Sequence, residues 1–240
     1  MVHPRAELST DEMARLEGFI ARRAAREPLP YILGEVEWYS LTLLVTPAAI
    51  VPRPETEMLA EAAIARGAAL RARLGIDVGT GSGAIALALA KHLPDLQVVA
   101  SDISREALAL ARENCRRHDL GQRVLLVCCD LLKGVRGGAE FIVANLPYIG
   151  SDEFADLQPE VRDYEPRLGL DGGRDGLGII RRMSGELRDH LAPGGFAALE
   201  VGAGQAAEVA KLLVGGGLCE IEVVPDLAGI GRVVIGWRRG

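Results

Sequence analysis

From residue 74 onward the sequence alternates short apolar runs with segments of helical periodicity, and this alternation most constrains the fold. The apolar runs predict strands at residues 74–78, 97–101, 123–129, 141–145, 196–201, 219–224 and 232–237. Helices are predicted between most of them, at residues 84–93, 104–117, 175–191 and 204–214. Continuous apolar strands joined by helices are typical of a parallel sheet covered on both faces. We therefore expect a doubly wound α/β fold.

The last two predicted strands are joined without a helix. Only the stretch PDLAGIG separates them, so we expect an antiparallel hairpin at one end of a seven-stranded, mostly parallel sheet. Residues 146–174 form a long excursion after the fourth strand. Ligands of open parallel sheets bind outside the carboxyl ends of the strands, so this excursion is expected to cover a substrate.

The residues that precede the sheet are expected to be partly helical. Ser9 and Glu12 form a capping box for a helix over residues 9–27, which the following prolines end. Apolar residues recur on one face of this helix: Met13, Leu16, Phe19 and Ile20. Residues 41–57 predict a short strand and a proline-punctuated loop, and a helix is expected over residues 57–71.

Charge and composition exclude some classes of function. The formal net charge is −6, which argues against non-specific binding of nucleic acid, because that affinity comes chiefly from Lys and Arg. The longest apolar runs, such as AIALALA, are too short to span a bilayer, so we expect a soluble, cytoplasmic protein. The cysteines lack the CxxC spacing of zinc sites and are interpreted as reduced packing residues: Cys115, Cys128, Cys129 and Cys219. No metal is expected.

A glycine-rich turn follows the first predicted strand, in DVGTGSGAIALALA. Glycines at 79, 81 and 83 allow a tight turn and a close approach of the backbone to a ligand, and the next helix presents unpaired N–H groups. This predicts a nucleotide-type site. The pattern leaves the cofactor open, because Gly79, Gly81 and Ala84 also satisfy the relaxed dinucleotide fingerprint.

Two acidic residues end the next two strands. Asp102 lies 23 positions after Gly79 and can accept hydrogen bonds from two ribose hydroxyls, which suits both NAD and S-adenosylmethionine. The alternative role for Asp102 is a helix cap, but Ser104 fills that role better. Asp130 can receive an adenine amino group, with Leu131 packed on the base; a simple turn residue is a nearly equally good interpretation of Asp130.

The fourth strand ends in an unusual way, with Asn145, Leu146, Pro147 and Tyr148. The Asn145 side-chain oxygen and the Leu146 carbonyl can each accept one N–H of a planar NH₂ group, on which Tyr148 can stack. Transfer of a methyl group to such a nitrogen needs this arrangement, because its delocalised lone pair is a poor nucleophile that must be held in line with the methyl. A nicotinamide enzyme would instead need a site for hydride transfer. The four residues therefore favour a methyltransferase.

Over nearly its whole length the chain resembles the PrmC/HemK family of release factor glutamine methyltransferases. The resemblance lies in PLPYILGEVEWYSLTLLVTPAAIVPRPETE (28–57), DVGTGSGAIALALA (77–90), SDIS (101–104), NLPYI (145–149), YEPRLGLDGGRDGL (164–177) and DLAGIGRVV (226–234). It implies a Rossmann-like class I fold and methylation, by S-adenosylmethionine, of the Gln side-chain nitrogen in the Gly-Gly-Gln motif of class 1 release factors. It also implies cofactor contacts for Gly79, Thr80, Gly81, Ser82, Gly83, Asp102, Leu131 and Asn145, and glutamine contacts for residues 145–148.

One departure from the family concerns Leu146, because the family motif is Asn-Pro-Pro-Tyr. Leu146 keeps the carbonyl but restores an N–H and frees φ; since it precedes Pro147, it is still biased toward extended geometry. The Leu form also resembles the Asn-Leu-Pro-Tyr motif of ribosomal RNA adenine dimethyltransferases. Methylation of an RNA adenine is therefore an alternative function, and a catalytically idle binding module is another.

A second departure lies at the front of the chain. The family usually carries a helical N-terminal domain that helps to dock the release factor, and here only the helix at 9–27 precedes PLPYILG. We expect residues 1–40 to be a remnant of this docking domain and residues 41–240 to form the methyltransferase domain. Substrate affinity is then expected to be lower than in the family, with catalysis retained.

Overall fold

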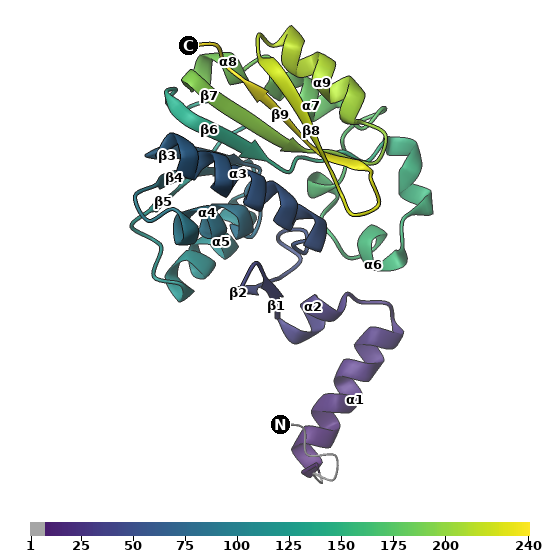
Figure 1. Ribbon diagram of the computed structural model, residues 1–240. Helices are drawn as coiled ribbons and strands as arrows, with labels where there is room; N and C mark the ends of the chain where they lie inside the picture. Colours follow the sequence, from purple (N-terminus) through teal and green to yellow (C-terminus); the bar gives the residue numbers. More distant parts are fainter. Residues whose placement is uncertain (1–7) are drawn as a thin grey trace.

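The structure, a computed structural model, describes residues 8–240 and is built on a central sheet. Within those residues the sheet has seven strands in the order β5-β4-β3-β6-β7-β9-β8 (Figure 1). They are β3 (Leu74–Val78), β4 (Gln97–Asp102), β5 (Val124–Cys128), β6 (Ala139–Ala144), β7 (Leu191–Glu200), β8 (Cys219–Pro225) and β9 (Gly231–Trp237). The first five strands in this order run parallel, whereas β9 is antiparallel to β7 and β8. The predicted doubly wound sheet and its C-terminal hairpin are confirmed.

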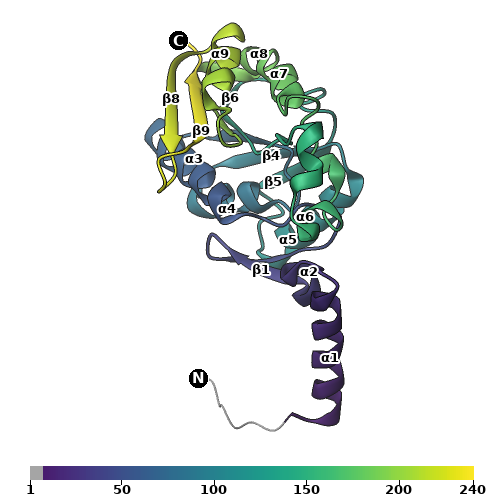
Figure 2. The ribbon, with the colours of Figure 1, turned by 90° about the vertical axis from the view of Figure 1, so that its right-hand side faces the viewer.

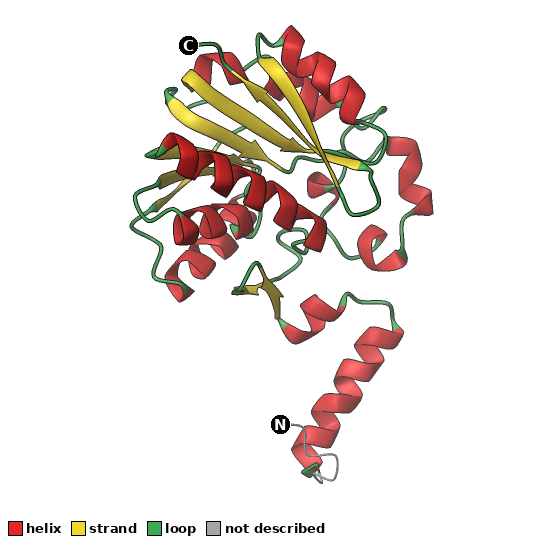
Figure 3. Ribbon diagram, viewed as in Figure 1, coloured by secondary structure: helices red, strands yellow, loops and turns green. Residues whose placement is uncertain are grey.

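Helices cover both faces of the sheet (Figure 3). One layer consists of α3 (Glu57–Leu70), α4 (Ala84–His92) and α5 (Arg105–Arg117), and the other of α7 (Gly178–Ser184), α8 (Leu187–His190) and α9 (Ala206–Gly215). Phe141 of β6 belongs to the core under the first layer, and its neighbour Ile142 belongs to the core under the second. Both side chains are fully buried, which explains why the strand is apolar without alternation.

The N-terminal helix α1 (Thr10–Ala24) projects away from the sheet domain (Figure 2). Its predicted capping box is present: the Glu12 N–H donates to Ser9 Oγ at 3.3 Å, and the Ser9 N–H donates to Glu12 Oε2 at 2.8 Å. The predicted apolar face is largely open to solvent, with exposed fractions of 44% for Met13 and 58% for Ile20. Ion pairs join the C-terminal end of α1 to Glu160 of α6 (Pro159–Arg162).

Several predicted boundaries were wrong for local reasons. The helix predicted at 9–27 ends at Ala24, and a short helix α2 (Leu29–Leu33) follows, because Pro30 occupies its first turn, where proline is tolerated. The hairpin of β1 (Glu35–Trp38) with β2 (Leu41–Leu44) includes a strand that was not predicted. The helix predicted at 175–191 is interrupted at Gly185, and β7 starts at Leu191, five residues earlier than expected.

The excursion at 146–174 is ordered by short helical turns. It contains η2 (Ser151–Asp156), α6 and η3 (Arg167–Gly169), and a further 3-10 turn, η1 (Pro54–Thr56), precedes α3.

Among the cysteines, all free, Cys115 is buried as expected, whereas Cys128 is exposed, so the packing interpretation was wrong for Cys128. None of the helices within residues 8–240 combines the length and apolar character needed to cross a membrane.

Candidate active site

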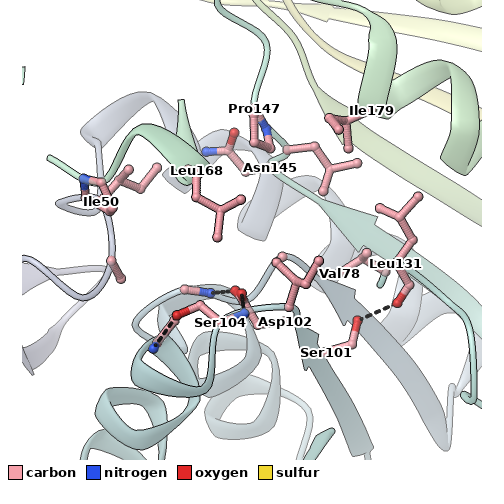
Figure 4. Close-up of a pocket in the computed structure, with 18 of the residues that line it drawn as sticks. Ile50, Val78, Ser101, Asp102, Ser104, Leu131, Asn145, Pro147, Leu168 and Ile179 are labelled. Atoms are coloured by element: carbon pink, nitrogen blue, oxygen red, sulfur yellow. Dashed lines mark hydrogen bonds between the residues drawn. The ribbon is translucent and has the colours of Figure 1, made fainter. Parts of the chain in front are cut away.

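A pocket of about 290 Å³ opens at the carboxyl ends of β3, β4 and β6. Val78, Asp102 and Asn145 line it from these three strand ends (Figure 4). This is the edge of the sheet at which ligands of doubly wound folds bind, because the connections leave a crevice where the strand order reverses. Here β3 is that point: one connection leads from β3 to β4 on one side, and β6 lies on the other.

The glycine loop forms one wall of this pocket. Gly79, Gly81 and Gly83 have φ values of 73°, 56° and 85°, a region that residues with a Cβ rarely adopt. A Cβ on Gly79 would lie 3.0 Å from Leu146 Cδ2, so this position also has no space for a side chain. The N–H groups of Gly79 and Thr80 both donate to the Ser101 carbonyl, at 2.8 and 2.9 Å. The loop is therefore held in a fixed shape that leaves its backbone open to a ligand.

Asp77, which the sequence interpretation did not single out, supports the loop from behind. It is fully buried, and its Oδ2 accepts from Thr80 Oγ1 at 2.6 Å and from the Ala86 N–H at 3.2 Å. Burial raises the pKa of Asp77 to about 7. An acidic residue inside a buried strand directly before a glycine turn could have identified it, because burying a carboxylate is costly without a structural role.

Asp102 contacts the loop and the next helix at the same time. Its Oδ2 accepts from the Gly81 N–H at 2.9 Å and its Oδ1 from the Ser104 N–H at 2.8 Å (Figure 4). Burial raises the pKa of Asp102, and these backbone hydrogen bonds oppose the shift. Ser104 caps α5 as expected, its Oγ accepting from the Ala107 N–H. Each Asp102 oxygen keeps a lone pair for a ribose hydroxyl.

Asp130 and Leu131 lie at the side of the pocket formed by β5. Asp130 Oδ2 pairs with Lys133 at 3.0 Å and with Arg182 at 2.5 Å, and hydrogen bonding to Lys133 is the main cause of its lowered pKa. Both pairs use Oδ2, so Oδ1 takes part in neither of them, and the contact of Asp130 with an adenine amino group stays a prediction. Leu131 is buried with φ of 55°, and its carbonyl accepts from Ser101 Oγ (Figure 4).

The residues after β6 divide into two groups. Asn145, Leu146 and Pro147 line the pocket, and Asn145 and Pro147 lie across it from Asp102 (Figure 4). Tyr148 does not line it: its carbonyl accepts from Gln205 Nε2 at 2.9 Å, and its ring lies beside Gly202 after β7. Thr80, Ser82 and Gly83 also lie outside the pocket wall, and Thr80 and Ser82 are buried. These four residues are placed next to the pocket instead of facing it.

Two segments cover the pocket: residues 48–50 before η1, which the sequence interpretation did not assign to the site, and Pro166, Leu168 and Gly169 at η3, which belong to the excursion expected to cover a substrate. They touch, since a Cβ on Gly169 would come within 2.8 Å of Ile50 Cγ2. An ion pair between Arg53 Nη2 and Glu165 Oε1 at 2.5 Å ties their flanks together. The pairing is long-range, so only the three-dimensional structure reveals it.

The pocket suits S-adenosylmethionine. Gly79 and Gly81 provide a wall of backbone without side chains, and Asp102 provides the carboxylate for a ribose. Apolar side chains such as Leu131 and Leu168 provide surfaces for a purine ring. Within residues 8–240 no group of three His, Cys, Asp or Glu side chains could hold a metal ion.

Comparisons with known proteins define the class. Residues 55–157 match the model of the methyltransferase small domain, and residues 1–34 match that of the PrmC N-terminal domain. The fold is similar to the hMettl16 catalytic domain in complex with a 3′UTR hairpin (TM-score 0.65, 15% identity, 99% of this chain and 86% of that one). It is also similar to a methyltransferase from Pyrococcus furiosus (TM-score 0.62, 18% identity, 97% and 100%). The protein has the class I fold of methyltransferases that use S-adenosylmethionine.

Curated relatives identify the family within this class. The release factor glutamine methyltransferase of Geobacter sulfurreducens is 45% identical over 95% of this chain and 80% of its own length. Those of Moorella thermoacetica and Koribacter versatilis are 43% and 42% identical, and each alignment covers 83% of the relative. The chain belongs to the release factor glutamine methyltransferase family.

Proposed function

We propose that this protein transfers a methyl group from S-adenosylmethionine to the side-chain amide nitrogen of the glutamine in the Gly-Gly-Gln motif of class 1 release factors. The observation that carries the proposal is the position of Asn145 and Leu146 in the wall of the same pocket as the glycine loop and Asp102. Two amide acceptors next to a cofactor site match a planar NH₂ substrate.

In this proposal the residues of the chain bind and orient the glutamine. The Asn145 side-chain oxygen and the Leu146 carbonyl each accept one N–H, which holds the nitrogen in line with the methyl. Both oxygens also stabilise the positive charge that grows on nitrogen. When bound, S-adenosylmethionine supplies an electrophilic methyl: the C–N bond forms as the C–S bond breaks, and the nitrogen loses a proton to water. No general base is needed, because the methylated nitrogen is strongly acidic.

Tyr148 is proposed to hold the acceptor residues in place without lining the pocket itself. Its ring is partly buried, and burial, together with the nearby Glu200 carboxylate, raises its pKa. Its contacts with Gly202 and Gln205 anchor the backbone that follows Leu146 and Pro147. Tyr148 thus fixes the position of Leu146 and Pro147. It can stack on the glutamine amide only if the substrate enters beside its ring.

The N-terminal part is proposed to dock the release factor, as expected for residues 1–40; residues 1–7 lie outside those described. Support comes from α1, which extends from the domain with Met13, Leu16 and Ile20 exposed (Figure 2). Residues 41–240 are proposed to carry catalysis. We further propose that the enzyme acts in the cytoplasm without binding nucleic acid directly, in agreement with its net charge of −6.

Transfer of labelled methyl groups to a purified release factor tests the proposal. A copy of the factor with the motif glutamine changed to alanine serves as the control, and ribosomal RNA is the third substrate. Label on the unmodified factor alone supports the proposal. Label on the RNA alone would establish methylation of an RNA adenine, the function of the enzymes whose motif the Leu146 form resembles. No label on any substrate would favour an idle fold.

A further inference from the structure

The side-chain amide of Asn145 is anchored from outside the pocket. Its Nδ2 donates to Thr56 Oγ1 at 3.0 Å, across 89 positions of sequence. Thr56 is only 5% exposed and is the last residue of η1, directly before α3, in the PRPETE stretch. A terminal amide has a donor and an acceptor end. With Nδ2 held by Thr56, Oδ1 is left to accept from a substrate N–H.

A hydroxyl alone cannot impose this orientation, because Thr56 Oγ1 can donate as well as accept. A third group removes the ambiguity. Glu200, the last residue of β7, is 3% exposed, and hydrogen bonding by Thr56 and Asn145 opposes the rise that burial causes in the pKa of its carboxyl group. An ionised carboxylate only accepts, so it takes the Thr56 O–H and turns the lone pairs of Thr56 toward Nδ2.

Two features suit a role for these side chains beyond the local structure of their own elements. Thr56 occupies the N-cap position of α3, where threonine normally accepts from the first turn, yet its side chain makes no capping bond. Glu200 Oε2 is buried and accepts no hydrogen bond from any of residues 8–240, an arrangement that is costly for a carboxylate without a role. Neither side chain lines the pocket, so both act through Asn145.

We propose that Thr56 and Glu200 are positioning residues that fix the amide of Asn145 with its oxygen toward the substrate. The inference rests on the proposed function, in which that oxygen accepts an N–H of the target glutamine. If the amide turned over, Asn145 would present N–H groups to the N–H groups of the substrate. We expect binding of S-adenosylmethionine to be affected less, because neither Thr56 nor Glu200 lines the pocket.

The charge on Glu200 connects this network to pH. Burial raises the pKa of Glu200 to about 7, and the groups that surround it are Glu55, which raises it further, and Arg232, which lowers it, together with Tyr148. Once protonated, Glu200 can donate to Thr56, and the hydrogen bonds can reverse so that Thr56 donates to Asn145 Oδ1. With a pKa of about 7, we expect kcat to be about tenfold lower at pH 6 than at pH 8.

The test uses the full chain and a release factor as substrate. Thr56→Val keeps the shape but removes the hydroxyl, and we expect kcat to fall on the order of 10- to 100-fold with the Kd of S-adenosylmethionine nearly unchanged. Thr56→Ser should restore most of the rate. Ser184→Ala, which removes another buried hydroxyl that bonds to the Ile180 carbonyl, is the matched control and should keep the wild-type kcat.

The pH profile of Glu200→Gln supplies a second, independent readout: the loss of rate between pH 8 and pH 6 should disappear. Wild-type kcat in Thr56→Val, or an unchanged acid limb in Glu200→Gln, would overturn the inference while the proposed function stands. A wild-type enzyme without transfer to the release factor would instead overturn the proposed function itself. If the unfolding transition shows that Thr56→Val does not fold, the pH profile of Glu200→Gln alone tests the inference.

Discussion

The ion pair between Arg53 and Glu165 should support the pocket cover through charge. The Glu165 side chain is 1% exposed and that of Arg53 is 33% exposed. Changing Arg53 to Met, a neutral residue with a long side chain, leaves a buried carboxylate without a partner. Removing one member of a buried pair costs about 3–5 kcal/mol, and partial exposure of Arg53 reduces this, so we expect a loss of roughly 2–4 kcal/mol of unfolding free energy.

The direction in which this loss of unfolding free energy changes with pH shows whether Arg53 acts through its charge or through packing. Burial raises the pKa of Glu165, and Arg53 opposes the shift. A carboxyl group with a raised pKa binds more protons in the folded state, so its contribution to stability falls as pH rises from the unfolded value through the folded one. Without Arg53 the pKa of Glu165 rises further. The loss caused by Arg53→Met should therefore be larger at pH 8 than at pH 5.

Urea denaturation of the wild type, Arg53→Met and Arg53→Met/Glu165→Leu at both pH values measures this loss. The double variant should recover most of the stability, because no unpaired charge remains. Affinity for S-adenosylmethionine should follow the same order, since the segments joined by the pair cover the pocket. An equal loss at both pH values, or a double variant no more stable than the single one, would show that the Arg53 stem matters through packing and would refute the argument.

Three further outcomes are expected. Gly79→Ala places a Cβ at φ of 73°, 3.0 Å from Leu146 Cδ2. The resulting strain of about 1–2 kcal/mol should weaken S-adenosylmethionine binding by roughly tenfold in calorimetry, and unchanged affinity would contradict the role of the loop. Asp102→Ala removes the acceptor of the Gly81 and Ser104 N–H groups and should lower the same affinity by about 10- to 100-fold, whereas a wild-type Kd would remove Asp102 from the site. Leu146→Pro should leave that affinity unchanged and alter the initial rate of methyl transfer little, because Pro147 already favours an extended Leu146; a large rise would mean that the leucine impairs catalysis.

The sheet was predictable because burial on both faces leaves a pattern that few other structures share. The run at 141–145 has no alternation, and its residues are divided between the two cores. Local elements with weak patterns were not predicted. β1 is only four residues long, and α2 has a proline in its first turn. The break at Gly185 depends on packing: a Cβ on Gly216, after α9, would lie 2.2 Å from the Ser184 carbonyl. No periodicity within one segment reports such a contact.

The site was predictable where it follows the strand ends, and not where it depends on distant segments. Asp102 and Asn145 each follow an apolar run, so the parallel topology alone brings them to one edge. Thr56 is different. Its hydroxyl meets Asn145 only because α3 packs against β6 and β7, and the same packing lets Thr56 influence the pKa of Glu200. A threonine after a proline-rich loop is interpreted as a helix cap until the folded structure shows another partner.

The pocket depends on residues on both sides of the boundary expected at residue 40. Tyr31, 6% exposed, donates its hydroxyl to the Ala49 carbonyl at 2.7 Å, and Trp38, 2% exposed, donates Nε1 to the Arg53 carbonyl at 2.8 Å. Both carbonyls belong to the segment that covers the pocket or flanks it. Residues on the N-terminal side of that boundary therefore have two roles: α2 and β1 hold the cover in place, whereas α1 is the part proposed to dock a release factor. Docking of a release factor on α1 would act on the pocket through this short connection.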